Sequence, residues 1–159
     1  MTPIFIAGPC VIESADLLDE VACELVRIKQ KFNIEIYFKA SFDKANRTSV
    51  HSYRGPGLEK GLQMLDDVRE KYGLKLLTDI HESFQAAPVG EVVDVPADTG
   101  LFVPSDRLLV AAARTGKIVN IKKAQFLSGL DMKYPVEKAQ ESGAKEIWAD
   151  RARQYLRLQ

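Results

Sequence analysis

Cysteine is scarce in this sequence, and several other features are missing with it. Only Cys10 and Cys23 occur among 159 residues, too few for a disulfide framework and consistent with the reducing cytoplasm. No run approaches the roughly 18 apolar residues of a membrane span, and no basic region precedes the apolar run in MTPIFIAGPC, which argues against a signal peptide. Lys+Arg and Asp+Glu are 22 each, so no overall field favours nucleic acid or an anionic membrane.

Short apolar runs alternate with segments of helical period along the whole chain. This alternation predicts a single α/β domain with a parallel sheet, and the continuous apolar character of the strands predicts that both sheet faces are covered. The predicted strands are residues 3–8, 34–40, 74–80, 92–95, 117–123 and 145–148; the predicted helices are residues 15–32, 58–72, 83–90, 107–115 and 134–142.

Two parallel architectures compete for this pattern. A dinucleotide-binding fold needs G-x-G-x-x-G after the first strand and an acidic residue at the end of the second. Here Gly8-Pro9-Cys10 follows the first strand and Lys39 ends the second, which argues against that fold. A (β/α)8 barrel predicts instead that polar residues gather where successive strands end. A barrel takes about 250 residues, so we expect an incomplete one, with about five βα units and a sixth strand.

Cationic and amide side chains do follow the strand ends. FKASFDKANRTSVHSYRGPG (38–57) comes after the second strand, Asp79 closes the third, and Lys122 and Gln125 follow the fifth. Lysine and arginine suit phosphate and carboxylate, so Lys39, Lys44, Arg47 and Lys122 predict a site for two small anions. Aromatic residues are not interleaved with these cations, which disfavours nucleic acid.

The same segments carry a family resemblance. IAGPCVIES, KASFDKANRTSVHSYRGPG, TDIHE and NIKKAQF resemble 3-deoxy-D-manno-octulosonate 8-phosphate synthase, also called 2-dehydro-3-deoxyphosphooctonate aldolase, over residues 3–95 and 108–148. The KANR segment is its most specific part. The related heptulosonate phosphate synthases have lysine-proline-arginine there, and they are the alternative.

The resemblance implies an activity and a set of site residues. The reaction would condense phosphoenolpyruvate with D-arabinose 5-phosphate and release inorganic phosphate, in a cytoplasmic homo-oligomer (a tetramer in this family) that serves lipopolysaccharide assembly. Matching positions place Lys39, Lys122 and Gln125 around phosphoenolpyruvate. The aldose phosphate would be held by Lys44, Asn46, Arg47 and Ser49, with Asp79 near Lys44, which would polarise the aldehyde oxygen.

The two cysteines have different expected roles. A cysteine after a strand is more often a small buried residue than a ligand. In this family, however, IAGPC marks the metal-dependent class, so the resemblance implies that Cys10 is a thiolate ligand of a zinc- or iron-like divalent ion. The other ligands come from later strands that this chain lacks, which leaves the site incomplete. Cys23 falls on the apolar face of the first predicted helix and is expected in the protein core.

Two segments depart from the family pattern, and frameshifts explain both. PADTGLFVPSDR (96–107) stands where the family has an IQIPAFLCRQTD-like segment. One coding of its QIPAFLCRQTD part, read from the third base, translates as DTGLFVPSDR and so reproduces Asp98 to Arg107. A coding of the family's LTERGNTFGYN, read out of frame, similarly gives DRARQYLRLQ (150–159) and a stop.

These departures change what we expect of the chain. Residues 1–148 would form a partial barrel with 96–107 frameshifted, followed by a frameshifted tail at 149–159. We expect little or no activity, open strand edges and exposed apolar faces, and hence aggregation or adventitious oligomers. A non-catalytic fragment that binds phosphosugars is a further alternative.

Overall fold

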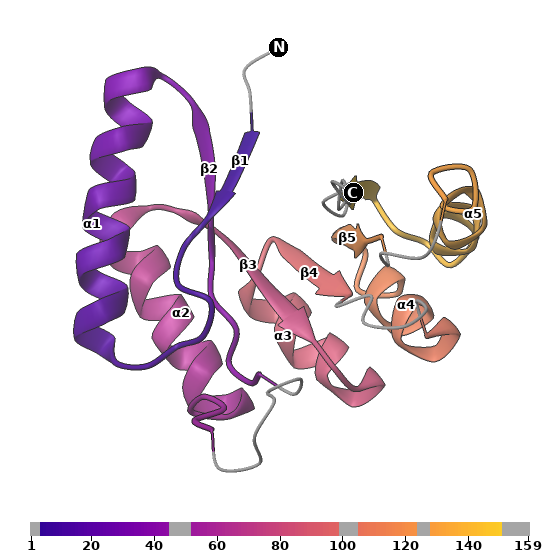
Figure 1. Cartoon of the computed structure of the whole chain (residues 1–159). Helices are drawn as coiled ribbons and strands as arrows, with labels where there is room; N and C mark the ends of the chain where they lie inside the picture. The colour runs from indigo at the N-terminus through magenta and orange to yellow at the C-terminus, as the bar shows by residue number, and fades with distance from the viewer. Residues whose placement is uncertain (1–3, 45–51, 99–104, 124–127, 151–159) are drawn as a thin grey trace, which may run out of the picture. The chain divides into compact units, whose positions relative to one another are not determined.

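The computed structural model describes residues 4–44, 52–98, 105–123 and 128–150, and the chain divides into two compact units. The first unit comprises Met1–Asp79 and Glu91–Asp94, and the second comprises Ile80–Gly90 and Val95–Gln159. In both units strands alternate with helices (Figure 1).

Three strands and two helices build the first unit. In chain order they are β1 (Ile4–Ala7), α1 (Ala15–Phe32), β2 (Glu35–Lys39), α2 (Leu58–Tyr72) and β3 (Lys75–Ile80). β2 pairs in parallel with both β1 and β3, and α1 and α2 lie on the same side of the strands (Figure 1). The three strands therefore end at one edge, which is where the sequence predicts the site.

The boundaries of the two long helices follow from their capping residues. The Ser14 hydroxyl accepts a hydrogen bond from the Leu17 backbone N–H at 3.1 Å and begins α1. Asn33 and Gly73 end α1 and α2 in the left-handed conformation, with φ of 50° and 63°. The buried faces consist of Leu18 and Ala22 in α1 and of Leu62, Leu65 and Val68 in α2.

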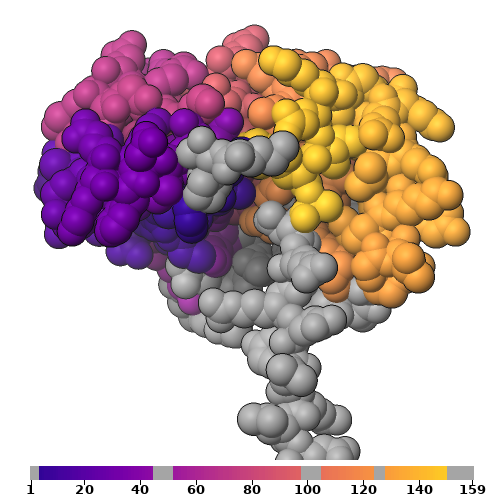
Figure 2. Space-filling model, turned by 90° about the horizontal axis from the view of Figure 1, so that it is seen from above, coloured from indigo at the N-terminus to yellow at the C-terminus, as the bar shows by residue number. Residues whose placement is uncertain are grey.

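The second unit repeats the pattern with shorter helices. Its elements are η1 (Ser83–Gln85), most of α3 (Ala86–Val92), β4 (Val95–Asp98), α4 (Asp106–Ala113), β5 (Ile118–Lys122), α5 (Lys133–Glu141) and β6 (Glu146–Asp150). β5 pairs in parallel with β4 and β6. The helix α5, orange to yellow in Figure 2, lies at the surface in that view, and its residue Tyr134 is 69% exposed.

The predicted fold class is confirmed: six strands alternate with helices and pair in parallel within each unit, as in a partial (β/α)8 barrel. The predicted fourth strand was misplaced, since β4 begins at Val95 whereas we expected 92–95. The reason is that α3 continues to Val92, and the Asp94 carboxylate then accepts a hydrogen bond from the Leu76 backbone N–H at 2.8 Å.

The expectation of covered sheet faces fails at β1, where the exposure agrees instead with the expected open strand edge, and the predicted burial of Cys23 was wrong. The apolar residues Ile4, Phe5 and Ile6 of β1 are 38–52% exposed, because β1 pairs only with β2 among the described residues. Cys23 is exposed as well, because it lies about 100° around α1 from the buried Ala22. Within the described ranges, no helix has the length and hydropathy to cross a bilayer.

Candidate active site at the carboxyl ends of β1, β2 and β3

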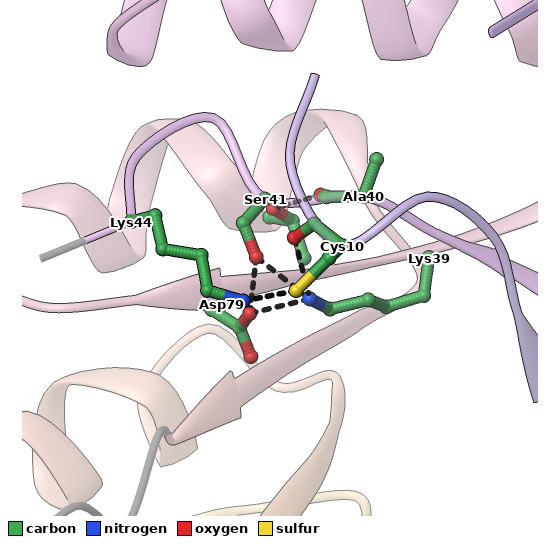
Figure 3. A network of polar contacts seen from close by, with 7 residues as sticks. Cys10, Lys39, Ala40, Ser41, Lys44 and Asp79 are labelled. Atoms are coloured by element: carbon green, nitrogen blue, oxygen red, sulfur yellow. Dashed lines mark hydrogen bonds and ion pairs between the residues drawn. The ribbon is translucent and has the colours of Figure 1, made fainter. Parts of the chain in front are cut away.

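A cluster of polar side chains lies where the three strands of the first unit end (Figure 3). Lys39 is the last residue of β2, Asp79 is the next to last residue of β3, and Cys10 follows β1 by three residues. The sequence predicted all three as site residues. Because carboxyl ends of parallel strands meet at one edge, the fold brings them together from positions 29 to 69 residues apart.

The Lys39 ammonium group is the centre of the cluster. Its Nζ lies 2.7 Å from Asp79 Oδ2, 2.7 Å from Ser41 Oγ and 3.4 Å from the Cys10 carbonyl oxygen. The Lys39 and Asp79 side chains are only 16% and 8% exposed. This ion pair is therefore largely shielded from water, where Coulomb attraction is stronger than at a surface.

Ser41 belongs to the cluster although our sequence reading did not select it. It is 2% exposed, and its hydroxyl donates a short hydrogen bond to Asp79 Oδ2 while accepting one from Lys39. A carboxylate only accepts and an ammonium only donates, so the direction of the hydroxyl proton is fixed. The available signal was a small polar residue two positions after the strand-ending lysine, in a stretch where Ala40 and Phe42 are buried.

A second lysine reaches the cluster from the loop after β2. Lys44 Nζ lies against Cys10 Sγ, and the side chains of Cys10, Lys39, Ser41, Lys44 and Asp79 point toward one another in Figure 3. Two ammonium groups accompany a single carboxylate in this set. The resulting excess of positive charge favours an anionic ligand.

Gly8, two residues before Cys10, permits the close approach of β1 to β2. Gly8 has φ of 150°, and a Cβ at this position would lie 2.2 Å from the Lys39 carbonyl oxygen. Any side chain at residue 8 would therefore displace either the turn that carries Cys10 or the backbone of Lys39.

The loop that carries the KANR motif is anchored at both ends. Arg54 makes a two-pronged ion pair with Asp43, at 2.9 Å and 2.6 Å, and its carbonyl accepts a hydrogen bond from the Lys44 backbone N–H at 2.7 Å. The Tyr53 hydroxyl donates to the Ile12 carbonyl at 3.1 Å. We call these contacts the loop base. The predicted site residues Asn46, Arg47 and Ser49 lie outside the described residues.

The remaining predicted residues belong to the second unit. Lys122 is the last residue of β5, and Gln125 lies outside the described residues. The position of Lys122 beside Lys39 stays a prediction, because the two units are described separately.

The described residues do not amount to a metal site. No three His, Cys, Asp or Glu side chains among them are grouped as ligands, and a metal at the Cys10 sulfur would meet the Lys44 ammonium. Cys10 is the single residue of the implied ligand set that the described part of the chain supplies.

Parallel βα units with a charged cluster at the carboxyl ends of their strands are the arrangement of (β/α)8-barrel enzymes. The comparison with protein families makes the assignment specific. The model of the DAHP synthetase I family matches residues 2–152, and the chain belongs to that family.

Individual relatives agree on one enzyme name. The chain is 58% identical over 136 residues to a 2-dehydro-3-deoxyphosphooctonate aldolase of Campylobacter jejuni, a match that covers 86% of this chain and 50% of the relative. Aldolases of the same name from Fusobacterium nucleatum and Helicobacter pylori are 51% and 50% identical, over 91% and 86% of this chain and 52% and 50% of theirs. The chain thus spans about half the length of the curated relatives it matches.

Proposed function

We propose that the reaction of this protein is the condensation of phosphoenolpyruvate with D-arabinose 5-phosphate to 3-deoxy-D-manno-octulosonate 8-phosphate and inorganic phosphate, and that the chain as given retains little or none of this activity. The observation that carries the proposal is the cluster of Lys39, Lys44 and Asp79 at the strand ends, in a chain whose relatives are named 2-dehydro-3-deoxyphosphooctonate aldolase. Both substrates are small anions, and a cluster with excess positive charge attracts them.

The chemistry has three parts. The methylene carbon of phosphoenolpyruvate forms a carbon–carbon bond to the aldehyde carbon, the aldehyde oxygen takes up a proton, and one water molecule is consumed as the phosphate leaves. In this proposal Lys39, Lys122 and Gln125 hold phosphoenolpyruvate. Lys44 places its ammonium group at the aldehyde oxygen and stabilises the negative charge that develops there.

The KANR loop would supply the aldose-binding residues. Asn46, Arg47 and Ser49 would bind the hydroxyl groups and the phosphate of the aldose, and the planar Arg47 guanidinium suits a phosphate. The loop base supports this role, because it fixes the chain on both sides of the motif.

Two finer points of the family likeness also remain proposals. In the intact enzyme Cys10 would contribute one thiolate to a zinc- or iron-like ion of the metal-dependent class, a site that is incomplete in this chain, and the intact protein would assemble as a homotetramer. Equilibrium dialysis with Zn²⁺ and sedimentation velocity test these points independently of turnover.

The central test separates binding from turnover. We expect phosphoenolpyruvate to bind the purified chain, and phosphate to be released after addition of arabinose 5-phosphate at no more than a small fraction of the rate of the full-length Campylobacter relative. Phosphate release with a four-carbon aldose phosphate instead would indicate the heptulosonate synthase, because seven carbons less three leave four. Binding of phosphoenolpyruvate without release would indicate the non-catalytic fragment, and absence of binding would refute both the synthase and the fragment.

A further inference from the structure

Three oxygen atoms of the described residues surround the Lys39 ammonium group. An ammonium carries three N–H donors; Nζ donates to Ser41 Oγ and to the Cys10 carbonyl oxygen, and the Asp79 carboxylate is its ion-pair partner. A ligand oxygen that approaches the ammonium group therefore competes with one of these three oxygens.

The three contacts are unequal, which identifies the one that is exchanged. Two are short, at 2.7 Å, and lead to nearly buried groups, whereas the contact to the Cys10 carbonyl is 3.4 Å long. N–H···O bonds weaken beyond about 3.2 Å, so the Cys10 contact is the least costly to lose. Cys10 is also exposed, which leaves this side of the ammonium group accessible to a ligand.

Ser41 determines where the exchangeable donor points. Because the ammonium group is tetrahedral, the hydrogen bond to Ser41 Oγ restricts the directions of its other two N–H bonds, and the Asp79 carboxylate 2.7 Å from Nζ holds the group in place by its charge. Ser41 in turn is held by its own hydrogen bond to Asp79 Oδ2. With Asp79 alone, the ammonium group would rotate about the remaining bond and its other two donors would lose their direction.

We propose that Ser41 is a positioning residue that aims one N–H of Lys39 at an oxygen of the anionic substrate, which takes the place of the Cys10 carbonyl. The choice of phosphoenolpyruvate as that anion rests on the proposed function. The restraint that Ser41 places on the ammonium group does not, and it is measurable without substrate.

The first measurement follows the ammonium group itself. With ¹⁵N at lysine Nζ, a restrained ammonium gives a ¹H–¹⁵N signal that survives at temperatures where exposed lysines have lost theirs through proton exchange. We expect such a signal from Lys39, assigned by its loss in Lys39→Arg. It should broaden or vanish in Ser41→Ala and persist in Ser41→Thr, which keeps the hydroxyl group.

The second measurement follows the ligand. In Ser41→Ala the N–H of Lys39 would no longer be aimed at the substrate oxygen, and the hydrogen bond between them would be lost. Loss of one hydrogen bond to a charged group costs about 1.5 kcal/mol or more, so the dissociation constant of phosphoenolpyruvate should rise about tenfold. Ser128→Ala is the matched control, because Ser128 Oγ also donates to an aspartate, Asp131 at 2.7 Å, but in the second unit and exposed. It should leave both the Lys39 signal and the affinity unchanged.

The outcomes are distinguishable. A Lys39 signal that is unaltered in Ser41→Ala, or lost in a folded Ser41→Thr protein, overturns the inference. A restrained signal that depends on Ser41 but does not respond to phosphoenolpyruvate supports the restraint and refutes the proposed substrate. Far-ultraviolet circular dichroism of each variant identifies any that fails to fold.

Discussion

The ion pair between Lys39 and Asp79 allows a quantitative prediction. Replacing Asp79 by asparagine keeps the size and a hydrogen-bond acceptor for Ser41 but removes the negative charge 2.7 Å from the Lys39 ammonium. At an effective dielectric constant of about 20, two charges at this distance attract by about 6 kcal/mol, and desolvation offsets part of that gain. Removing one partner of a buried pair typically costs about 3–5 kcal/mol.

We expect the lower end of that range for Asp79→Asn. Lys39 keeps the Ser41 and Cys10 oxygens as acceptors, so its charge stays partly solvated, and a loss of about 3 kcal/mol is reasonable. With an m-value of about 2 kcal/mol per molar urea, the unfolding midpoint should fall by about 1.5 M. Urea titration followed by far-ultraviolet circular dichroism measures this shift.

An exposed ion pair provides the control. Asp19 pairs with Lys71 in the same unit, but the two side chains are 47% and 60% exposed, and exposed pairs contribute little to stability. Asp19→Asn should therefore leave the midpoint nearly unchanged. If Asp79→Asn shifted the midpoint no more than Asp19→Asn does, the shielding of the Lys39–Asp79 pair would not have the energetic consequence argued here.

Three further predictions concern other parts of the chain. Gly8→Ala should destabilise the protein by more than about 2 kcal/mol, because it forces a side chain into a backbone position that cannot accept one. Gly129→Ala should have little effect, because a Cβ there would meet open space. Thermal melts of the two variants test this difference. The hydrogen bond from Lys71 lowers the pKa of Asp19 below its ordinary 3.8. The small stabilisation from this bond is therefore present above pH 3.8 and is lost as the pH falls through the lower pKa of the native state. In an NMR titration of the Asp19 carboxylate, the midpoint should rise in Lys71→Met. Sequencing of the coding DNA should show that codons 96–107, read in another frame, encode an IQIPAFLCRQTD-like segment, and codons unrelated to it would rule out the frameshift.

Much of the fold was predictable because its local signals are strong. The helices α1 and α2 have the bounds expected from the helical spacing of their apolar residues, 15–32 and 58–72, and Ser14 and Gly73 lie directly at those bounds. The prediction of where β4 begins was wrong, because Val92 and Val93 fit either a helix end or a strand. The outcome there depends on the contact between Asp94 and Leu76, which sequence spacing does not reveal.

The candidate site was predictable in its residue types but not in its pairing. Strand ends brought Cys10, Lys39 and Asp79 together, as the parallel βα pattern requires. The shared use of Asp79 Oδ2 by Lys39 and Ser41 depends on side-chain directions at the end of β2. Its position two residues after the strand-ending lysine was a weak signal, because serine is also common in exposed loops, and Ser41 was therefore missed.

The loop base has a consequence for how this protein can change. Asp43 and Arg54 join the two sides of the KANR segment through contacts that involve none of residues 45–51. These flanking contacts therefore offset the entropy lost when the loop is closed, and that loss grows only slowly with loop length. The sequence between Lys44 and Tyr53 can therefore change without loss of the contacts that hold the two flanks together.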